Sequence, residues 1–210
     1  MAGFKRDRKR RPGRRASFRK SKPDSLVVTE GIVTEIEYIQ GFKAACKNPR
    51  VDVQHPPKGG GVPKTLVQVA KKLKVENDKQ AKREGDDNIR FDEVWVVFDT
   101  DEHPNIDQAR RMADDNDIKA VQSNPSFELW LLLHFRDSPG QQHRDKIREL
   151  LKAYVKGYDK HVEYDDFEAC ELAAETRAEK LDKVAKSART PHHNPTTEMY
   201  LLTRSIRGSA

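Results

Sequence analysis

Four short stretches rich in apolar residues alternate with segments of helical periodicity in the first two thirds of the chain. They are LVVT, VDVQH, VWVVF and IKAVQS, at residues 26–29, 51–55, 94–98 and 118–123. Continuously apolar runs such as LVVT are typical of strands buried on both faces. VWVVF is β-branched and aromatic throughout, and we predict that it is the central strand.

Between these runs, apolar residues recur every three to four positions. Ile36, Ile39 and Phe42 predict a helix of about three turns that starts at Thr34 and ends before Asn48-Pro49. A second helix is expected to begin at Pro63 and to fade into the charged segment 76–88, and a third is expected from Ile106. The alternation of strands and helices predicts an α/β fold with a parallel, doubly wound sheet flanked by helices.

The remainder of the chain has helical patterns only. The expected helices span residues 125–135, 145–155, about 166–188, and 196–206. Asn124-Pro125 and Asn194-Pro195 are predicted to open helices, with Asn as the cap and Pro at the first helical position. The helix near 166–188 carries Leu172, Leu181 and Val184 as its large apolar residues. Whether this helix serves as a lid or as a dimer surface is left open by the sequence.

Charge is distributed unevenly along the chain. Residues 1–20 contain ten Lys or Arg and one Asp, a net charge of +9, which leaves 30 basic and 33 acidic residues, or −3, in the rest. A segment of this composition cannot bury enough apolar surface to fold, so we expect a disordered arm over residues 1–22. Such arms commonly bind nucleic-acid phosphates, although a merely solubilising tail is the alternative.

Composition also restricts the class of protein. No stretch has the ~20 apolar residues that crossing a bilayer requires, and the basic N-terminus has no apolar segment typical of a signal peptide. A cytoplasmic protein is therefore expected. Cys46 and Cys170 are isolated and are predicted to be reduced. We expect an α/β domain at residues 23–136 and a helical extension, packed on it, at residues 137–210.

Carboxylates follow two of the predicted strands directly. Glu30 comes after the first strand and Asp99 after the central one, and ligands of parallel sheets lie beyond the carboxyl ends of the strands. Neighbouring strands are about 4.8 Å apart, so the two carboxylates could share one cation, with Asp101 on the same face two residues later. Oxygen ligands without Cys or clustered His favour Mg²⁺ or Mn²⁺ over zinc.

This pattern resembles the Toprim domain of topoisomerases, primases and OLD-family nucleases, in which a strand ends in Glu-Gly and a later one in Asp-x-Asp. More narrowly, VVTEGIVTEIEYIQGF, VVFDTDEH and SNPSFELWLLLHF, with NPTTEMYLL further on, resemble RloB or AbiLii-like proteins. The resemblance covers about residues 25–135. It implies a Toprim-like fold, a divalent metal on Glu30, Asp99 and Asp101, and acid/base duty for Glu30 in cleaving a phosphodiester.

The OLD-type nucleases add two matches. Their second acid corresponds to Glu35, one residue further from Glu30 than in the common OLD pattern but typical of RloB-like chains, and their S-x-E corresponds to Ser126 and Glu128. The resemblance implies that these residues bind a second metal ion. Alternatively, Glu35 is favoured by the helix dipole, and Glu128, which precedes the apolar WLLL, pairs with a basic side chain.

The resemblance also implies a setting. RloB and AbiLii-like proteins are bacterial antiphage defence components, usually encoded beside a P-loop ATPase, and related nucleases cleave DNA or RNA. OLD nucleases use a later lysine, and Lys152, Lys156 and Lys160 are all candidates here. We expect Tyr38 to pack in the core, which argues against topoisomerase chemistry, and His192 and His193 to be exposed.

The carboxylates and the resemblance together lead us to expect a Mg²⁺- or Mn²⁺-dependent endonuclease of the Toprim type that acts on nucleic acid, and the resemblance alone implies a P-loop ATPase as its partner. Metal ions in such a site polarise the scissile phosphate and activate water. Two alternatives stay open. One is a non-catalytic nucleic-acid-binding or assembly subunit, and the other is an enzyme that acts on the phosphates of nucleotides.

Overall fold

The structure, a computed structural model, describes residues 22–56, 61–100 and 105–208. The basic arm falls almost entirely outside these residues, so its disorder stays a prediction. Asp101 also lies outside the described residues.

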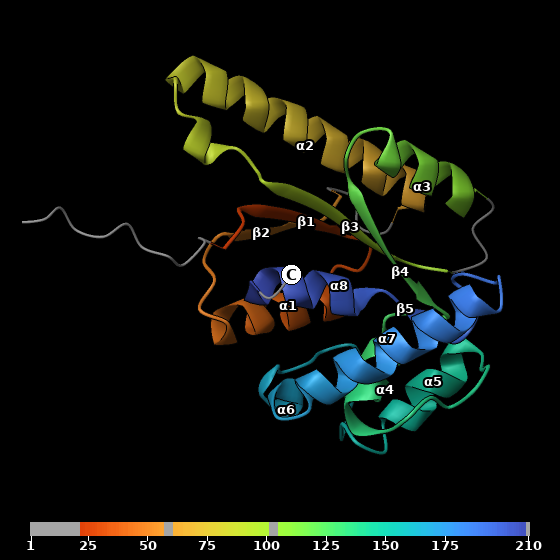
Figure 1. Ribbon diagram of the computed structural model, residues 1–210. Helices are drawn as coiled ribbons and strands as arrows, with labels where there is room; N and C mark the ends of the chain where they lie inside the picture. Colours follow the sequence, from red (N-terminus) through yellow and green to blue (C-terminus); the bar gives the residue numbers. More distant parts are fainter. Residues whose placement is uncertain (1–21, 57–60, 101–104, 209–210) are drawn as a thin grey trace, which may run out of the picture.

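A five-stranded sheet forms the centre of the fold (Figure 1). Its order is β2-β1-β3-β4-β5, and the strands span Ser25–Thr29 (β1), Val51–Gln54 (β2), Glu93–Asp99 (β3), Lys119–Asn124 (β4) and Thr196–Thr197 (β5). The first four are parallel, and β3 is central, which confirms the predicted α/β class. The short β5 pairs antiparallel with β4 and was not predicted, because two threonines carry no strand pattern.

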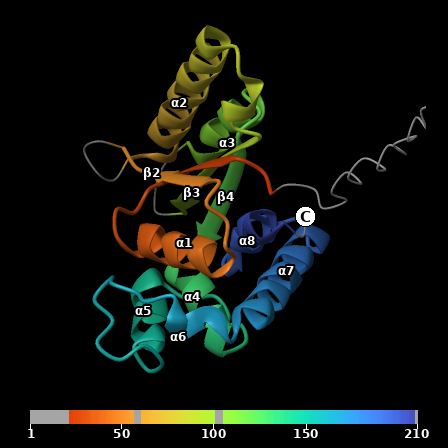
Figure 2. The ribbon, with the colours of Figure 1, turned by 90° about the vertical axis from the view of Figure 1, so that its left-hand side faces the viewer.

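Helices cover both faces of the sheet. α2 (Pro63–Glu84) and α3 (Ile106–Asp114) lie on one face, and α1 (Thr34–Ala45) and α8 (Met199–Arg207) on the other (Figures 1 and 2). Side chains alternate accordingly along the strands: Val28 and Phe98 belong to the core under α2, whereas Val27 and Val97 belong to the core under α1. This two-sided burial explains why the middle of β1 (residues 26–28) and of β3 (residues 94–98) is continuously apolar.

The remaining helices form a further layer beyond α1 (Figure 2). They are α4 (Glu128–Phe135), α5 (Arg144–Leu151), α6 (Asp165–Glu168) and α7 (Glu171–Ser187). A short 3₁₀ helix, Asp87–Ile89, lies elsewhere, next to α2. One hydrophobic core joins Val97 of the sheet, Leu131 of α4 and Phe167 of α6. This core therefore contains residues from both sides of position 136. The predicted boundary between an α/β domain and a helical extension at that position stays a prediction.

The prediction that the two Asn-Pro pairs open helices is wrong. Both peptide bonds are cis, and α4 and α8 begin only at Glu128 and Met199. The Asn side chains instead bind backbone carbonyls of distant segments, because Asn124 Nδ2 donates to His192 O at 2.8 Å and Asn194 Nδ2 donates to Gln142 O at 2.7 Å.

Two helices differ from their expected form. α2 continues through the charged segment to Glu84 and ends at Gly85, whose φ of 66° provides a left-handed C-cap. In α7, Leu172 and Val184 are 66% and 60% exposed. Its buried face is formed instead by alanines and acids, namely Glu171, Ala174, Glu175, Ala178, Asp182 and Ala185.

Two further expectations concern the whole chain. Cys46 and Cys170 are free thiols, as predicted. Among the described helices, none combines the length and the apolar character that a bilayer crossing requires.

Candidate active site

Glu30 and Asp99 lie side by side at the carboxyl edge of the sheet. β1 and β3 are adjacent and parallel, with Thr29 in register with Val97. The Glu30 amide extends this pairing by donating to Val97 O at 2.9 Å, and the Asp99 amide donates to Glu30 Oε2 at 3.2 Å. The predicted adjacency of these two residues is therefore confirmed. Asp101, expected beside them, is not among the described residues.

Glu35 faces the same space from the first turn of α1. Its side chain is buried, and the carboxylate fills the space that a β-carbon on Gly31 would need. Burial, followed by the charges of Glu128 and Glu30, raises the pKa of Glu35 to about 7, although hydrogen bonds from backbone amides oppose the shift. Glu35 is thus part of one cluster with Glu30 and Glu128.

Glu128, at the start of α4, already has polar partners. Ser126 Oγ donates to its Oε2 at 2.6 Å, Arg148 Nε to its Oε1 at 3.2 Å, and Tyr158 OH to its Oε1 at 3.3 Å. The basic side chain considered as an alternative to a metal is therefore present, and it comes from α5. A metal-binding role for Ser126 and Glu128 stays a prediction.

These acids line a cleft of about 400 Å³, which basic side chains also line. Its charged residues are Glu30, Glu35, Asp99, Glu128, Arg144, Arg148 and Lys160. Arg144 and Arg148 were not predicted to belong to the site. Their spacing of four residues places them on one face of α5, but only the packing of α5 shows that this face borders the acids.

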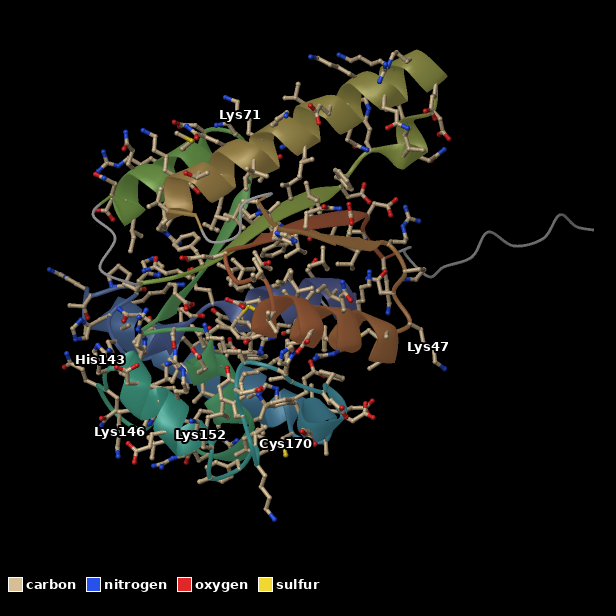
Figure 3. All side chains as sticks on the ribbon, turned by 180° about the vertical axis from the view of Figure 1, so that it is seen from behind. Lys47, Lys71, His143, Lys146, Lys152 and Cys170 are labelled. Carbon is tan, nitrogen blue, oxygen red and sulfur yellow. The ribbon has the colours of Figure 1, made fainter. Side chains whose placement is uncertain are left out.

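Lys160 is the one of the three candidate lysines that lines this cleft. Lys156 lines a separate groove, and Lys152 lies exposed just beyond the end of α5 (Figure 3). The backbone of Lys160 is left-handed, with φ 95°, a conformation that non-glycine residues seldom adopt.

The segment that carries Lys160 is anchored to the first turns of α1. Thr34 Oγ1 donates to Lys160 O at 2.6 Å, and the amide of Val162 donates to Glu37 Oε2 at 2.8 Å. His161 Nδ1 also contacts Glu37 Oε1 at 2.8 Å. These contacts hold the unusual backbone in place.

The chemistry of the donors suits a divalent cation. The acids and Ser126 offer only oxygen atoms, the ligands that Mg²⁺ and Mn²⁺ prefer. Burial, and after it the charges of Glu128 and Glu30, raise the pKa of Glu35, and a cation bound among these carboxylates would oppose the shift. Within the part of the chain that the structure describes, no three His, Cys, Asp or Glu side chains already form a metal-binding group.

Two residues considered in the sequence lie elsewhere. Tyr38 is fully buried among aromatic rings and hydrogen-bonds His134 Nε2 at 3.1 Å, as the packing prediction requires. His193 is exposed as expected. His192 is not, because its Nδ1 lies 3.7 Å from Glu198 Oε1 and its side chain is only 22% exposed.

Comparison with known families of proteins gives a match over most of the chain. The model of a family described as RloB-like protein matches residues 25–206. No curated protein and no solved structure matches the chain.

Proposed function

The chain belongs to the RloB-like family, and from this premise we propose that it is a divalent-metal-dependent nuclease that hydrolyses phosphodiester bonds in nucleic acid. One observation carries the proposal: Glu30 and Asp99, from adjacent parallel strands, line a single cleft with three basic side chains. Carboxylates can hold a metal ion there, and cations can hold the phosphate.

Glu30 and Asp99, with Asp101, are the proposed metal ligands. Glu35, Ser126 and Glu128 are proposed to complete the shell of a second ion. A bound Mg²⁺ or Mn²⁺ supplies Lewis-acid polarisation of the phosphate and a water of lowered pKa. The hydrogen bond from the Asp99 amide orients the Glu30 carboxylate, and both residues line the cleft.

The basic side chains supply the opposite charge. Arg144 and Arg148 can bind phosphate oxygens through their planar guanidinium groups. Lys160, held by its anchored backbone, is proposed to balance the negative charge that develops on the reacting phosphate. The cleft thereby distinguishes a phosphodiester from an uncharged substrate.

The partners follow from the charge and the family. The N-terminal arm, whose residues 1–20 carry a net charge of +9, is proposed to bind nucleic-acid phosphates outside the cleft. By resemblance to RloB and AbiLii-like proteins, we further propose a role in antiphage defence, regulated by a P-loop ATPase. A homo-oligomer is compatible with the exposed apolar residues of α7.

The direct test is cleavage of plasmid DNA and of tRNA by the purified chain with Mg²⁺, with Mn²⁺ and with EDTA. Asp99→Ala and Glu30→Gln should abolish metal-dependent cleavage while the thermal unfolding curve stays cooperative. Asp52→Ala removes an exposed carboxylate from β2 and should leave cleavage unchanged. Cleavage that survives Asp99→Ala would refute the assignment.

A non-catalytic nucleic-acid-binding subunit is the second candidate, because Arg148 already neutralises Glu128 without a metal. That protein would bind DNA or RNA equally well in EDTA and would cleave neither. Binding assays in parallel with the cleavage assay separate the two functions.

A further inference from the structure

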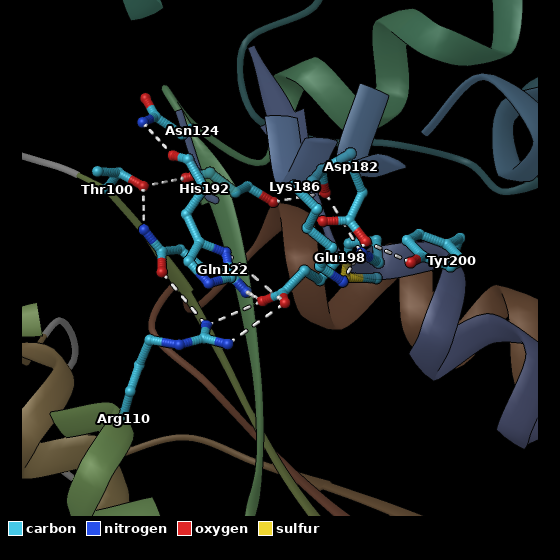
Figure 4. A network of polar contacts seen from close by, with 12 residues as sticks. Thr100, Arg110, Gln122, Asn124, Asp182, Lys186, His192, Glu198 and Tyr200 are labelled. Atoms are coloured by element: carbon cyan, nitrogen blue, oxygen red, sulfur yellow. Dashed lines mark hydrogen bonds and ion pairs between the residues drawn. The ribbon is translucent and has the colours of Figure 1, made fainter. Parts of the chain in front are cut away.

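Glu198 is a buried carboxylate with a full set of polar partners. It precedes α8, its residue is 5% exposed, and it belongs to the fragment NPTTEMYLL, to which the proposed chemistry assigns no role. Arg110 donates two hydrogen bonds to it, from Nη1 at 2.9 Å and from Nη2 at 3.3 Å (Figure 4). The amide of Gln122 adds a third bond, at 3.1 Å.

The network continues from Arg110 to the active-site strand. Arg110 Nη1 also donates to Gln122 Oε1 at 3.3 Å, and Gln122 Nε2 donates to Thr100 Oγ1 at 2.8 Å (Figure 4). Thr100 in turn binds Ser123 O through its amide at 2.8 Å and through its hydroxyl at 3.0 Å. Thr100 directly follows Asp99.

Glu198 is thus linked by hydrogen bonds to two points of the chain that bracket residues 101–104. Thr100 lies just before this segment, and Arg110 belongs to α3, which starts just after it. Thr100 is bound to Gln122 and Ser123 of β4. Arg110 is bound to Gln122 and to Glu198, which directly follows β5. A bidentate, charge-assisted contact with a buried carboxylate is strong and directional, and loss of one partner leaves the other uncompensated.

We propose that Glu198 is a positioning residue for the active site. Through Arg110 and Gln122 it fixes Thr100, and thereby the backbone that directs Asp99 and its amide toward Glu30. The consequence for metal binding rests on the proposed function, whereas the consequence for the backbone does not.

The chain offers a matched control in Glu175. This carboxylate is 3% exposed and accepts hydrogen bonds from Arg204, Arg207 and Thr203. It joins α7 to α8 and does not line the cleft. Glu175→Gln therefore removes an equally buried charge without touching the Thr100 network.

Hydrogen exchange of the metal-free protein tests the backbone. Glu198→Gln should accelerate exchange of the Thr100 amide roughly tenfold relative to Glu175→Gln, because local opening then costs less. Arg110→Lys keeps the charge but loses the bidentate geometry, and it should act in the same direction if Glu198→Gln folds poorly. Equal exchange at Thr100 in the Glu175 variant and in whichever network variants fold would overturn the proposal.

Calorimetric titration with Mn²⁺ tests the consequence for the site. Glu198→Gln should weaken Mn²⁺ binding roughly tenfold, as the loss of a group supporting metal ligands does elsewhere, and Glu175→Gln should not. Unchanged Mn²⁺ affinity in Glu198→Gln would show that the network does not position Asp99. If the wild-type protein binds no Mn²⁺, the proposed function fails, while the exchange of Thr100 still decides whether Glu198 holds the backbone.

Discussion

The carboxylate of Glu35 occupies the space that a side chain on Gly31 would fill. The glycine that follows Glu30 is therefore required by a close approach from α1. This contact places Glu35 beside Glu30 and Glu128 in the cleft. The glycine after Glu30 therefore helps to shape the cleft.

Gly31→Ala should impair the site more than the fold. The added methyl group would displace the end of a flexible side chain, so we expect a change of less than about 1 kcal/mol in the free energy of unfolding, with a clear loss of Mn²⁺ affinity. Gly41→Ala is the contrast, because its β-carbon would overlap Cβ of Tyr164. That overpacking should cost about 1–3 kcal/mol. Urea unfolding of both variants checks the difference, and a large destabilisation by Gly31→Ala would contradict it.

The stability of the metal-free protein should depend on Glu35 near neutral pH. Burial and the neighbouring acids raise its pKa from 4.5 to about 7, so the folded state binds the proton more tightly than the unfolded state. The stabilisation is complete below pH 4.5 and is lost as pH rises through about 7, a change of about 3 kcal/mol. Glu35→Gln should remove this part of the pH dependence in urea unfolding at pH 5 and pH 8. Parallel curves for both proteins would refute the shift.

His134 should produce the opposite dependence in the core. Its Nδ1 donates to Trp130 O at 3.0 Å, so Nε2 accepts from the Tyr38 hydroxyl, and burial lowers its pKa from 6.5 to about 4. The contribution of neutral His134 to the free energy of unfolding is complete above pH 6.5. It is lost as pH falls through about 4, a change of about 3 kcal/mol. His134→Gln should flatten this limb of the acid unfolding curve. An unaltered acid limb would show that another group controls it.

Lys160 should matter for cleavage and little for stability. Lys160→Met keeps the stem but removes the charge, and we expect kcat/KM to fall by about 10²-fold with an unchanged melting temperature. Lys152→Met, at an exposed site outside the cleft, is the control. Equal activities of the two variants would exclude Lys160 from the reaction.

Much of the central fold could be predicted from local patterns. The apolar runs around Val27 and Val97 and the stripe through Ile39 and Phe42 identify strands and a helix, because burial on one or both faces imposes a period on the sequence. The same logic placed Glu30 and Asp99 at strand ends, and the pairing of β1 with β3 confirms their adjacency.

Other features carry no local signal. The Thr196-Thr197 pair becomes a strand only because β4 offers it an edge, and Asn124 binds His192 O instead of capping a helix. Likewise, α7 can bury Glu171 and Glu175 because Arg204 and Arg207 of α8 neutralise them, whereas its Asp182 pairs with Lys186. A residue's partner in space decides each of these outcomes.

The sequence by itself determined the first four strands, the helices between them and the two carboxylates at the ends of β1 and β3, since these depend on periodicity and on residues next to one another in the chain. Only the tertiary structure decided which cations meet those acids. Arg148 and Lys160 reach the cleft because α5 and the following segment fold back onto α1 and α4. Such contacts depend on packing between segments far apart in the sequence, so no short-range pattern in the chain predicts them.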